Sequence, residues 1–171
     1  MKKVNYIIVL AFILSINLIS AQEEKTDTSK FSLGFTLSEQ LVGKDSGENI
    51  EGILGYAITS NMSIYLSAAN ATMRSKALDS NYKLDKYAIQ VAHDFAKSES
   101  TKLESILGFS YLNFDEKILE DDHNGLGIDL GVQTTFNLEH RLNYGLRIVV
   151  TYSSFSPGAI LNAGINFSYR I

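Results

Sequence analysis

The chain has 171 residues, no cysteine, one proline and a formal net charge of −4. The lack of cysteine excludes a disulfide scaffold, a thiolate metal site and a lipid anchor on an amino-terminal cysteine. The acidic balance argues against nucleic acid as a partner.

Residues 1–21 have the pattern of a cleaved signal peptide. Lys2 and Lys3 precede an apolar run over residues 6–16, and the small residues Ser20 and Ala21 follow. The alternative interpretation is an uncleaved anchor helix. Cleavage would remove two of the 15 basic residues, leaving 13 against 19 acidic ones and a net charge of −6. Residues 22–30 then predict a short polar lead-in, and residues 31–171 a single domain.

Eight segments of the remaining chain alternate apolar and polar side chains, the period of a β-strand with two different faces. The clearest is LGIDLGVQTTF over residues 126–136, where Leu126, Ile128 and Leu130 alternate with Gly127 and Asp129. The eight predicted strands cover residues 31–38, 49–58, 62–71, 82–96, 102–114, 126–136, 141–152 and 159–171.

The connections between these strands also alternate. Those after the second, fourth and sixth strands are short, whereas residues 39–48, 72–81 and 115–124 predict longer polar loops. In an up-and-down meander, alternate connections lie at opposite ends. Short turns at one end and longer loops at the other are typical of outer-membrane barrels, in which the long loops face the outside of the cell.

The composition of the two faces indicates which one meets lipid. The polar face is rich in Gly, Ser and Thr, which suit the narrow lumen of an eight-stranded barrel. Nine Phe and nine Tyr occur in the chain, and sixteen of them lie beyond residue 21. Twelve of these share the apolar face: Phe31, Phe35, Tyr56, Tyr87, Phe95, Phe109, Tyr111, Phe136, Tyr144, Tyr152, Phe167 and Tyr169. This favours an apolar face toward lipid; a secreted lipocalin-like barrel with that face inside is the alternative.

Charged residues on the polar face predict a network that fills the lumen. They are Glu51, Lys86, Asp94, Lys102, Glu104, Asp129, Arg147 and Arg170. Because buried charges need partners, and because the sixth and seventh strands are neighbours, we expect Asp129 to pair with Arg147. Glu51 and Lys86 are expected to complete that cluster, and Arg170 to lie near the short-turn opening within reach of Glu104 or Asp94.

The end of the chain, NAGINFSYRI, resembles the assembly signal of outer-membrane barrels. Asn162, Gly164, Phe167 and Tyr169 follow its order of a polar residue, a glycine and two spaced aromatics. The chain after residue 21 as a whole resembles the small eight-stranded barrels of the OmpA transmembrane-domain or OmpX type. The resemblance implies an all-β, antiparallel, up-and-down transmembrane β-barrel in a Gram-negative outer membrane. It also implies contact with outer-membrane lipid, including lipopolysaccharide, and with the barrel assembly machinery, but it carries no catalytic residue.

The three histidines offer little catalytic chemistry. His93 falls on the lipid-facing set, His123 follows the acidic residues 120–122 in a loop, and His140 lies in a short turn. None has a strand neighbour two residues away on the same face that bears a hydroxyl or carboxylate. We therefore expect no cofactor, and we expect the acidic loop to be solvated in preference to forming a cation site. The expected role is structural, adhesive or that of a complex subunit, through external loops that could bind a protein partner. A small lipid A-modifying enzyme is the alternative.

Overall fold

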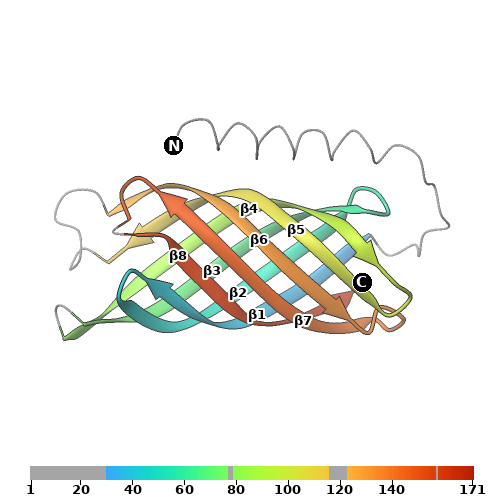
Figure 1. Ribbon diagram of the computed structural model, residues 1–171, viewed down its shortest axis with the longest axis horizontal. Coiled ribbons are helices and arrows are strands. Elements are labelled where there is room, and N and C mark those ends of the chain that lie inside the picture. The colour runs from blue at the N-terminus through green and yellow to red at the C-terminus, as the bar shows by residue number, and fades with distance from the viewer. Residues whose placement is uncertain (1–29, 77–78, 116–122, 157) are drawn as a thin grey trace.

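The computed structural model describes residues 30–76, 79–115, 123–156 and 158–171, and within them eight antiparallel strands close into a barrel (Figure 1). The strands are β1 (Phe31–Val42), β2 (Asp45–Ala57), β3 (Met62–Ser75), β4 (Ser80–Lys97), β5 (Thr101–Phe114), β6 (Asn124–Phe136), β7 (Leu142–Ser153) and β8 (Ile160–Arg170). Each strand pairs with the next and β8 pairs with β1, so the sheet has no free edge. The predicted fold class is confirmed.

The predicted signal peptide, residues 1–21, lies outside the described residues, as does the lead-in up to residue 29. In the described part of the chain no helix is long and apolar enough to cross a membrane.

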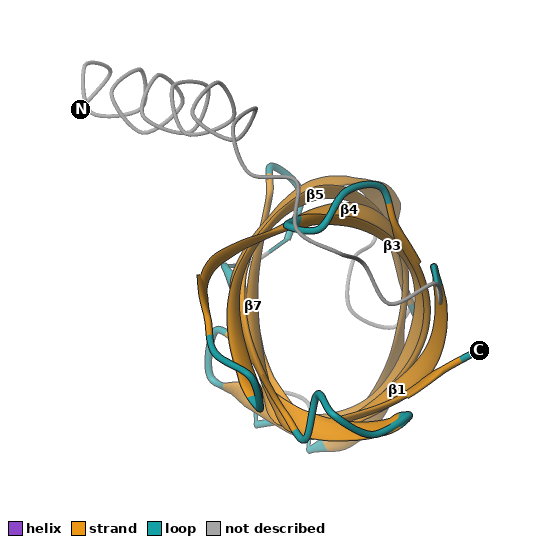
Figure 2. Cartoon of the chain, turned by 90° about the vertical axis from the view of Figure 1, so that its right-hand side faces the viewer, coloured by secondary structure: helices purple, strands orange, loops and turns teal. Residues whose placement is uncertain are grey.

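The two ends of the barrel differ. The β2–β3, β4–β5 and β6–β7 connections lie at one end, here called the short-turn end, where β1 also begins and β8 ends. The other four connections lie at what we call the long-strand end. In Figure 1 the short-turn end is on the right, and Figure 2 looks into the barrel from that end.

The apolar set of each strand faces outward, as expected. Phe109 is 64% exposed and Leu130 is 40% exposed, whereas their neighbours Ser110 and Asp129 are at most 1% exposed. The twelve aromatics assigned to the lipid face all lie on outward-facing positions, and three of the other four, Tyr65, Tyr82 and Phe114, are buried inside. A barrel with this surface buries its polar groups and presents hydrocarbon to its surroundings, which suits a bilayer.

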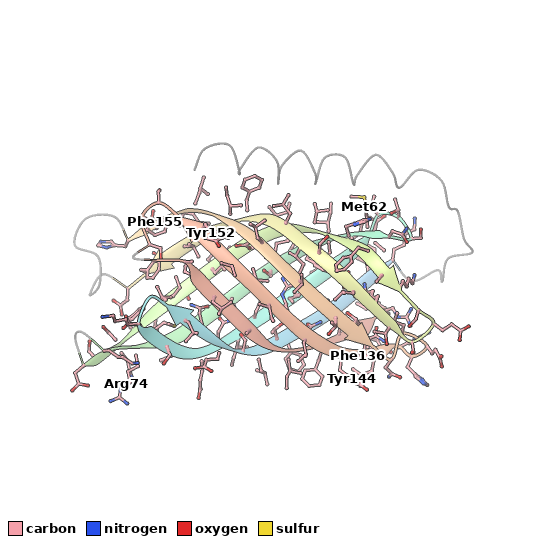
Figure 3. All side chains as sticks on the ribbon, in the orientation of Figure 1. Met62, Arg74, Phe136, Tyr144, Tyr152 and Phe155 are labelled. Carbon is pink, nitrogen blue, oxygen red and sulfur yellow. The ribbon has the colours of Figure 1, made fainter. Side chains whose placement is uncertain are left out.

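Aromatic side chains mark the two borders of this apolar belt. Tyr144 and Tyr152 lie on β7, eight residues apart, and both point outward near opposite ends of the barrel (Figure 3). Eight residues span roughly 26 Å along a strand, or about 20 Å along the axis at the usual tilt of about 40°. Phe136 stacks obliquely beside Tyr144, with ring centroids 5.8 Å apart. The spacing is somewhat shorter than the apolar band of about 25 Å that such a barrel presents to lipid.

Two of the predicted long loops are strand. β1 continues to Val42 and β2 begins at Asp45, so residues 39–48 form a tight hairpin in which Gly43 has φ = 61°, a conformation that favours glycine. Residues 72–81 likewise belong mostly to β3 and β4. The prediction is wrong because polar side chains can face outward from a strand that extends beyond the apolar belt, and so do not by themselves indicate a loop.

In these strand extensions the polarity of the two faces is inverted. Outward positions carry Glu48, Thr72 and Lys83, which are exposed, while most inward positions are apolar, with Gln40 and Ser75 as buried polar exceptions. The inward residues form what we call the apolar plug: Val42, Ala71, Met73, Tyr82, Leu84, Leu112, Phe114 and Ile160, all at most 2% exposed, with Phe155 packed against them. The Phe155 ring meets that of Phe114 edge-on at 5.8 Å. The long-strand end is thus built like a water-soluble protein, and it extends beyond the apolar belt.

Candidate functional site

The middle of the lumen holds a buried polar cluster, which we call the lumen network. It consists of Glu51, Lys86, Gln90, Glu104, Asp129, Gln133 and Arg147, each at most 7% exposed. The structure therefore brings together five of the eight charged residues predicted for this network, and Lys102 and Asp94 adjoin them through Glu104. Arg170 lies at the short-turn end.

Lys86 on β4 and Asp129 on β6 form one ion pair of the network. The Lys86 ammonium lies 2.9 Å from Asp129 Oδ1 and donates to Thr151 Oγ1 at 2.8 Å. Asp129 also accepts hydrogen bonds from Thr151 at 2.7 Å, from Ser110 at 3.0 Å and from Gln90 Nε2 at 2.6 Å. Four donors therefore compensate the carboxylate for the loss of water.

Arg147 on β7 is the centre of the network and is 1% exposed. Its Nε lies 3.3 Å from Glu51 Oε2 across the barrel. Its two terminal nitrogens donate to the amide oxygens of Gln90 and Gln133, the latter at 2.8 Å. The guanidinium carbon also lies 5.8 Å from the centre of the Tyr65 ring, within cation–π range.

Toward the short-turn end the network continues through Glu104. This carboxylate accepts hydrogen bonds from Tyr65 at 2.8 Å, Gln133 at 3.1 Å and Lys102 at 2.9 Å. Lys102 also lies 3.9 Å from Asp94. Acidic and basic groups thus alternate along one connected path from Lys86 to Asp94.

The expected pair of Asp129 with Arg147 is wrong, because the two ion pairs have exchanged partners. β6 and β7 are neighbours, but their register places Thr151 opposite Asp129 and Gln133 opposite Arg147. Gln90 bridges the two charged residues instead of a direct contact. Similarly, Lys102 takes the place beside Glu104 and Asp94 that we had expected for Arg170.

Gln90 and Gln133 were missed by the sequence reasoning, which followed charges only. Gln90, Gly108 and Asp129 share one row across β4, β5 and β6. Because Gly108 has no side chain, Gln90 reaches over it to Asp129; a Cβ at Gly108 would collide with Gln90. The feature that could indicate this contact is an inward glycine whose cross-strand neighbours are an inward amide on one side and an inward carboxylate on the other.

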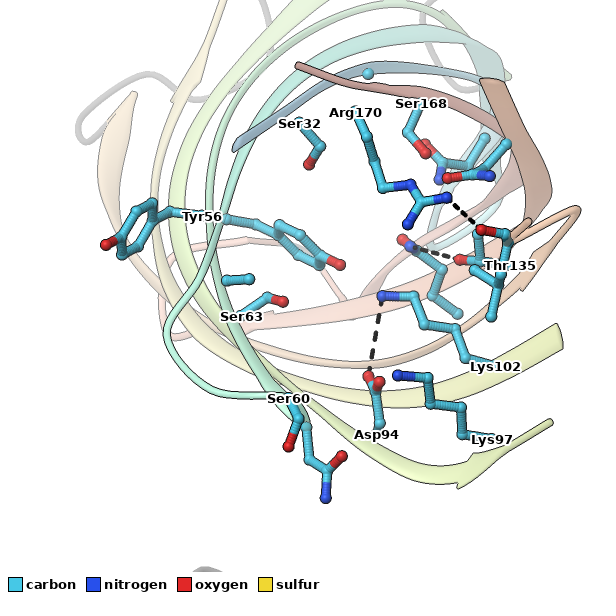
Figure 4. Close-up of a pocket in the computed structure, with 18 of the residues that line it drawn as sticks. Ser32, Tyr56, Ser60, Ser63, Asp94, Lys97, Lys102, Thr135, Ser168 and Arg170 are labelled. Carbon is cyan, nitrogen blue, oxygen red and sulfur yellow. Dashed lines mark hydrogen bonds and ion pairs between the residues drawn. The ribbon is translucent and has the colours of Figure 1, made fainter. Parts of the chain in front are cut away.

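The short-turn end of the lumen is hollow, which corrects the expectation of a lumen filled by side chains throughout. A cavity of about 920 Å³, here called the vestibule, opens there and is lined by Ser32, Ser63, Ser168, Lys102 and Arg170 among others (Figure 4). The small residues expected to fill the lumen leave this space. Arg170 lines it and donates to the carbonyl oxygens of Leu138 and, at 2.7 Å, His140.

The described histidines do not assemble an evident catalytic site. His93 lies opposite Ser105 on the outer face, but the Ser105 hydroxyl donates to the His93 backbone carbonyl at 3.4 Å. His140 is exposed in the β6–β7 turn. His123 precedes β6, and the acidic residues 120–122 beside it lie outside the described residues. No group of three or more potential metal ligands occurs within the described ranges.

The four residues that resemble an assembly signal all lie on β8. Asn162 and Gly164 occupy inward positions, whereas Phe167 and Tyr169 belong to the outward aromatic set. The Phe167 ring stacks on that of Phe35 across the β8–β1 closure at 5.2 Å. Recognition of this segment by an assembly machinery stays a prediction.

No protein-family model matches the chain, and no curated protein matches it in sequence. Solved structures match its fold. The neisserial surface protein NspA aligns with a TM-score of 0.57 at 11% identity, over 82% of this chain and 96% of that one. The outer-membrane enzyme PagL aligns at 0.54 and 15% identity, over 82% and 99%. Ail of Yersinia pestis, described as an attachment invasion locus protein and solved with a heparin analogue, aligns with a TM-score of 0.52 at 15% identity, over 83% of this chain and 97% of that one.

The closed sheet of eight strands, the outward apolar belt with its aromatic borders and these structural neighbours agree with one another. The chain has the fold of the small eight-stranded outer-membrane β-barrels.

Proposed function

We propose that the protein is a non-enzymatic, non-conducting barrel of a Gram-negative outer membrane that acts through its long-strand end. The observation that carries this is the double closure of the lumen. The lumen network crosses the barrel from Lys86 to Glu51, and the apolar plug closes the barrel above it with side chains at most 2% exposed. A solute would have to break buried ion pairs and displace the plug to pass, and this opposes a porin role.

The long-strand end supplies the interaction surface in this proposal. In the described residues it is a wall of β-sheet with exposed polar side chains such as Glu48, Lys83 and Asn113. Side chains carried on a hydrogen-bonded sheet bind a partner with little loss of backbone conformational entropy. The surface suits a structural, adhesion or complex-subunit role, and the description of Ail as an attachment protein adds support for adhesion within this fold.

The proposed orientation places the long-strand end outside the cell and the short-turn end in the periplasm. Trypsin added to intact cells is then expected to cut at the exposed turn residues Lys44 and Lys76, and to reach Lys97 and Arg141 only after permeabilisation. Cleavage in the reverse order would overturn the orientation.

Conductance tests the closure. Purified protein reconstituted in a planar bilayer is expected to show no stable open state, and a variant with Arg147→Ala is also expected to stay closed, because it loses the central cation of the network but keeps the apolar plug. A stable open state in the unmodified protein would overturn the non-conducting part of the proposal.

A lipid A-modifying enzyme is the second candidate, and two observations favour keeping it. PagL, a structural neighbour, is an outer-membrane enzyme, and Ser105 lies across from His93 on the outer face. The direction of the Ser105 hydroxyl toward a backbone carbonyl weighs against it. Mass spectrometry of lipid A from a deletion strain distinguishes the candidates: a changed acyl pattern that a Ser105→Ala variant fails to restore would establish the enzyme.

Outer-membrane lipid, including lipopolysaccharide, is the proposed surroundings of the belt, and the barrel assembly machinery is the proposed partner during insertion. The carboxy-terminal segment with Phe167 and Tyr169 is the expected recognition element. Replacing both aromatics with alanine is expected to reduce the amount of folded barrel in the membrane, and an unchanged amount would contradict this role.

A further inference from the structure

The vestibule is a cavity with a ligand-binding size and a defined wall. Its volume of about 920 Å³ lies within the range of known small-molecule sites, roughly 300–1,000 Å³. Ser32 on β1, Ser63 on β3 and Ser168 on β8 form its small-residue side, and Lys102 and Lys97 project from β5 and β4 (Figure 4). The buried pair of Tyr65 and Glu104 closes its floor.

The charge of the vestibule is opposite to that of the chain. Its lining has four basic and two acidic side chains: Lys30, Lys97, Lys102, Arg170, Asp94 and Glu99. The floor adds the Glu104 carboxylate, which lies 2.9 Å from the Lys102 ammonium, so one positive charge remains in excess. The whole chain has a net charge of −4. An excess of positive charge inside a concave, partly enclosed space raises the local concentration of anions. The charged group of a ligand held there is therefore negative.

The uncharged part of the lining is rich in hydrogen-bonding groups. It has seven Ser and Thr hydroxyls and four Asn and Gln amides. Hydroxyls and amides both donate and accept, and so they match a ligand that bears many hydroxyl groups of its own. A purely apolar or purely ionic ligand would leave most of these groups without a partner.

We propose that the vestibule binds an anionic sugar, that is, a sugar unit carrying a carboxylate or a phosphate. Lys97 and Lys102 from one side and Arg170 from the other attract the anionic group, while the serine side of the wall accommodates the hydroxyl-bearing ring. That the sugar comes from the periplasm rests on the orientation proposed above; binding itself does not depend on it.

Binding to the purified full-length protein in detergent or nanodiscs tests the proposal, with glucuronate, glucose 6-phosphate, glucose and inorganic phosphate as probes in calorimetry. The two anionic sugars are expected to bind about tenfold more tightly than glucose or inorganic phosphate, because each control lacks one of the two recognised features. A preference for only one anionic sugar would identify carboxylate or phosphate as the natural group and supports the proposal. Absence of binding, or equal binding of either control, would overturn it.

Two lysines on β4 distinguish the effect of a charge in the vestibule from the effect of the protein's net charge. Lys97→Gln removes a base from the vestibule, whereas Lys83→Gln removes an exposed base at the far end of the same strand. A unit charge about 7 Å away through water changes affinity about threefold, so Lys97→Gln is expected to weaken glucuronate binding by that factor. Lys83→Gln is expected to leave it unchanged. Equal effects of the two variants would overturn the assignment to the vestibule.

Thiol labelling gives a readout that does not depend on weak affinity. The chain has no cysteine, so Ser63→Cys places a single thiol in the vestibule wall and Ser154→Cys a control thiol at the long-strand end. A sulfonate-bearing methanethiosulfonate is expected to modify Ser63→Cys faster, relative to a trimethylammonium reagent, than it modifies Ser154→Cys, and glucuronate is expected to protect only the former. Equal reagent ratios at both sites without protection would contradict the proposal, whatever the outcome of the conductance and protease experiments.

Discussion

The ion pair between Lys86 and Asp129 gives an asymmetric prediction about stability. In Asp129→Asn the buried ammonium of Lys86, which is 7% exposed, keeps Thr151 as its remaining hydrogen-bond partner but loses its counter-charge. In Lys86→Met the carboxylate of Asp129 loses its counter-charge but keeps the hydrogen bonds from Gln90, Ser110 and Thr151. The first change should therefore cost more than the second.

The magnitudes follow from what each variant leaves behind. Removing one partner of a buried ion pair costs about 3–5 kcal/mol when the other charge is uncompensated, which is the expectation for Asp129→Asn. Because hydrogen bonds to a charged group are worth about 1.5–3 kcal/mol each, Lys86→Met is expected to cost only about 1–3 kcal/mol. The double variant removes both charges, and its cost should fall short of the sum by about 2 kcal/mol.

A second cycle, between Asp129→Asn and Arg147→Met, is the control. Within the described residues no hydrogen bond or ion pair joins Asp129 to Arg147 directly, and Gln90 links them, so their coupling should be no more than about 1 kcal/mol. Urea unfolding of the barrel in phospholipid vesicles, followed by tyrosine fluorescence and gel mobility, measures all five variants. If the coupling of Asp129 with Arg147 equals or exceeds that with Lys86, the partner assignment is wrong.

Three further predictions concern the belt and the plug. Arg substitution at Leu130 or Ile148, midway between the aromatic borders, should cost about 2–4 kcal/mol, whereas the same change at Gly158 in the β7–β8 connection should cost far less; equal costs would contradict the placement of the belt. Phe114→Ala in the plug should cost about 3–5 kcal/mol and exceed Phe109→Ala on the lipid face, as unfolding in vesicles would show. The purified protein should require detergent and show heat-modifiable gel mobility with strand-rich circular dichroism, and a soluble monomer without detergent would refute a membrane barrel.

Strands and faces could be predicted because strand alternation has a period of two and needs no knowledge of tertiary structure. The ends of the strands could not be predicted, because the apolar residues switch from one face to the other along a single strand. On β4, Tyr82 and Leu84 point inward, but Tyr87 and Ile89 point outward. A search for one continuous apolar face stops at such a switch and assigns the remainder to a loop.

The charged members of the lumen network could be predicted, but the two glutamines and the pairing of the charges could not. Adjacency of strands follows from the chain order, whereas contact follows from the register, which the sequence does not reveal. Asp129 and Arg147 sit four residues apart along the β6–β7 ladder, and a glycine on β5 decides that Gln90 reaches Asp129. The vestibule was missed for a related reason: small side chains were taken as filling the lumen, although their small volume is what leaves it open.

The inversion of polarity explains how one set of strands keeps a single register in two surroundings. A strand that is apolar on both faces gains almost as much when it slips by one residue, because every side chain then moves to an equally apolar face. At belt level the paired charges of the lumen network make the inward face distinct from the lipid face. Beyond the belt the two faces differ again, but in the opposite sense. There the outward residues Thr72 and Lys83 are polar and the inward residues Met73 and Tyr82 are apolar. Each of the strands β3–β5 thus has two faces of different polarity both at belt level and beyond it. The network therefore specifies register even if its ion pairs add little net stability.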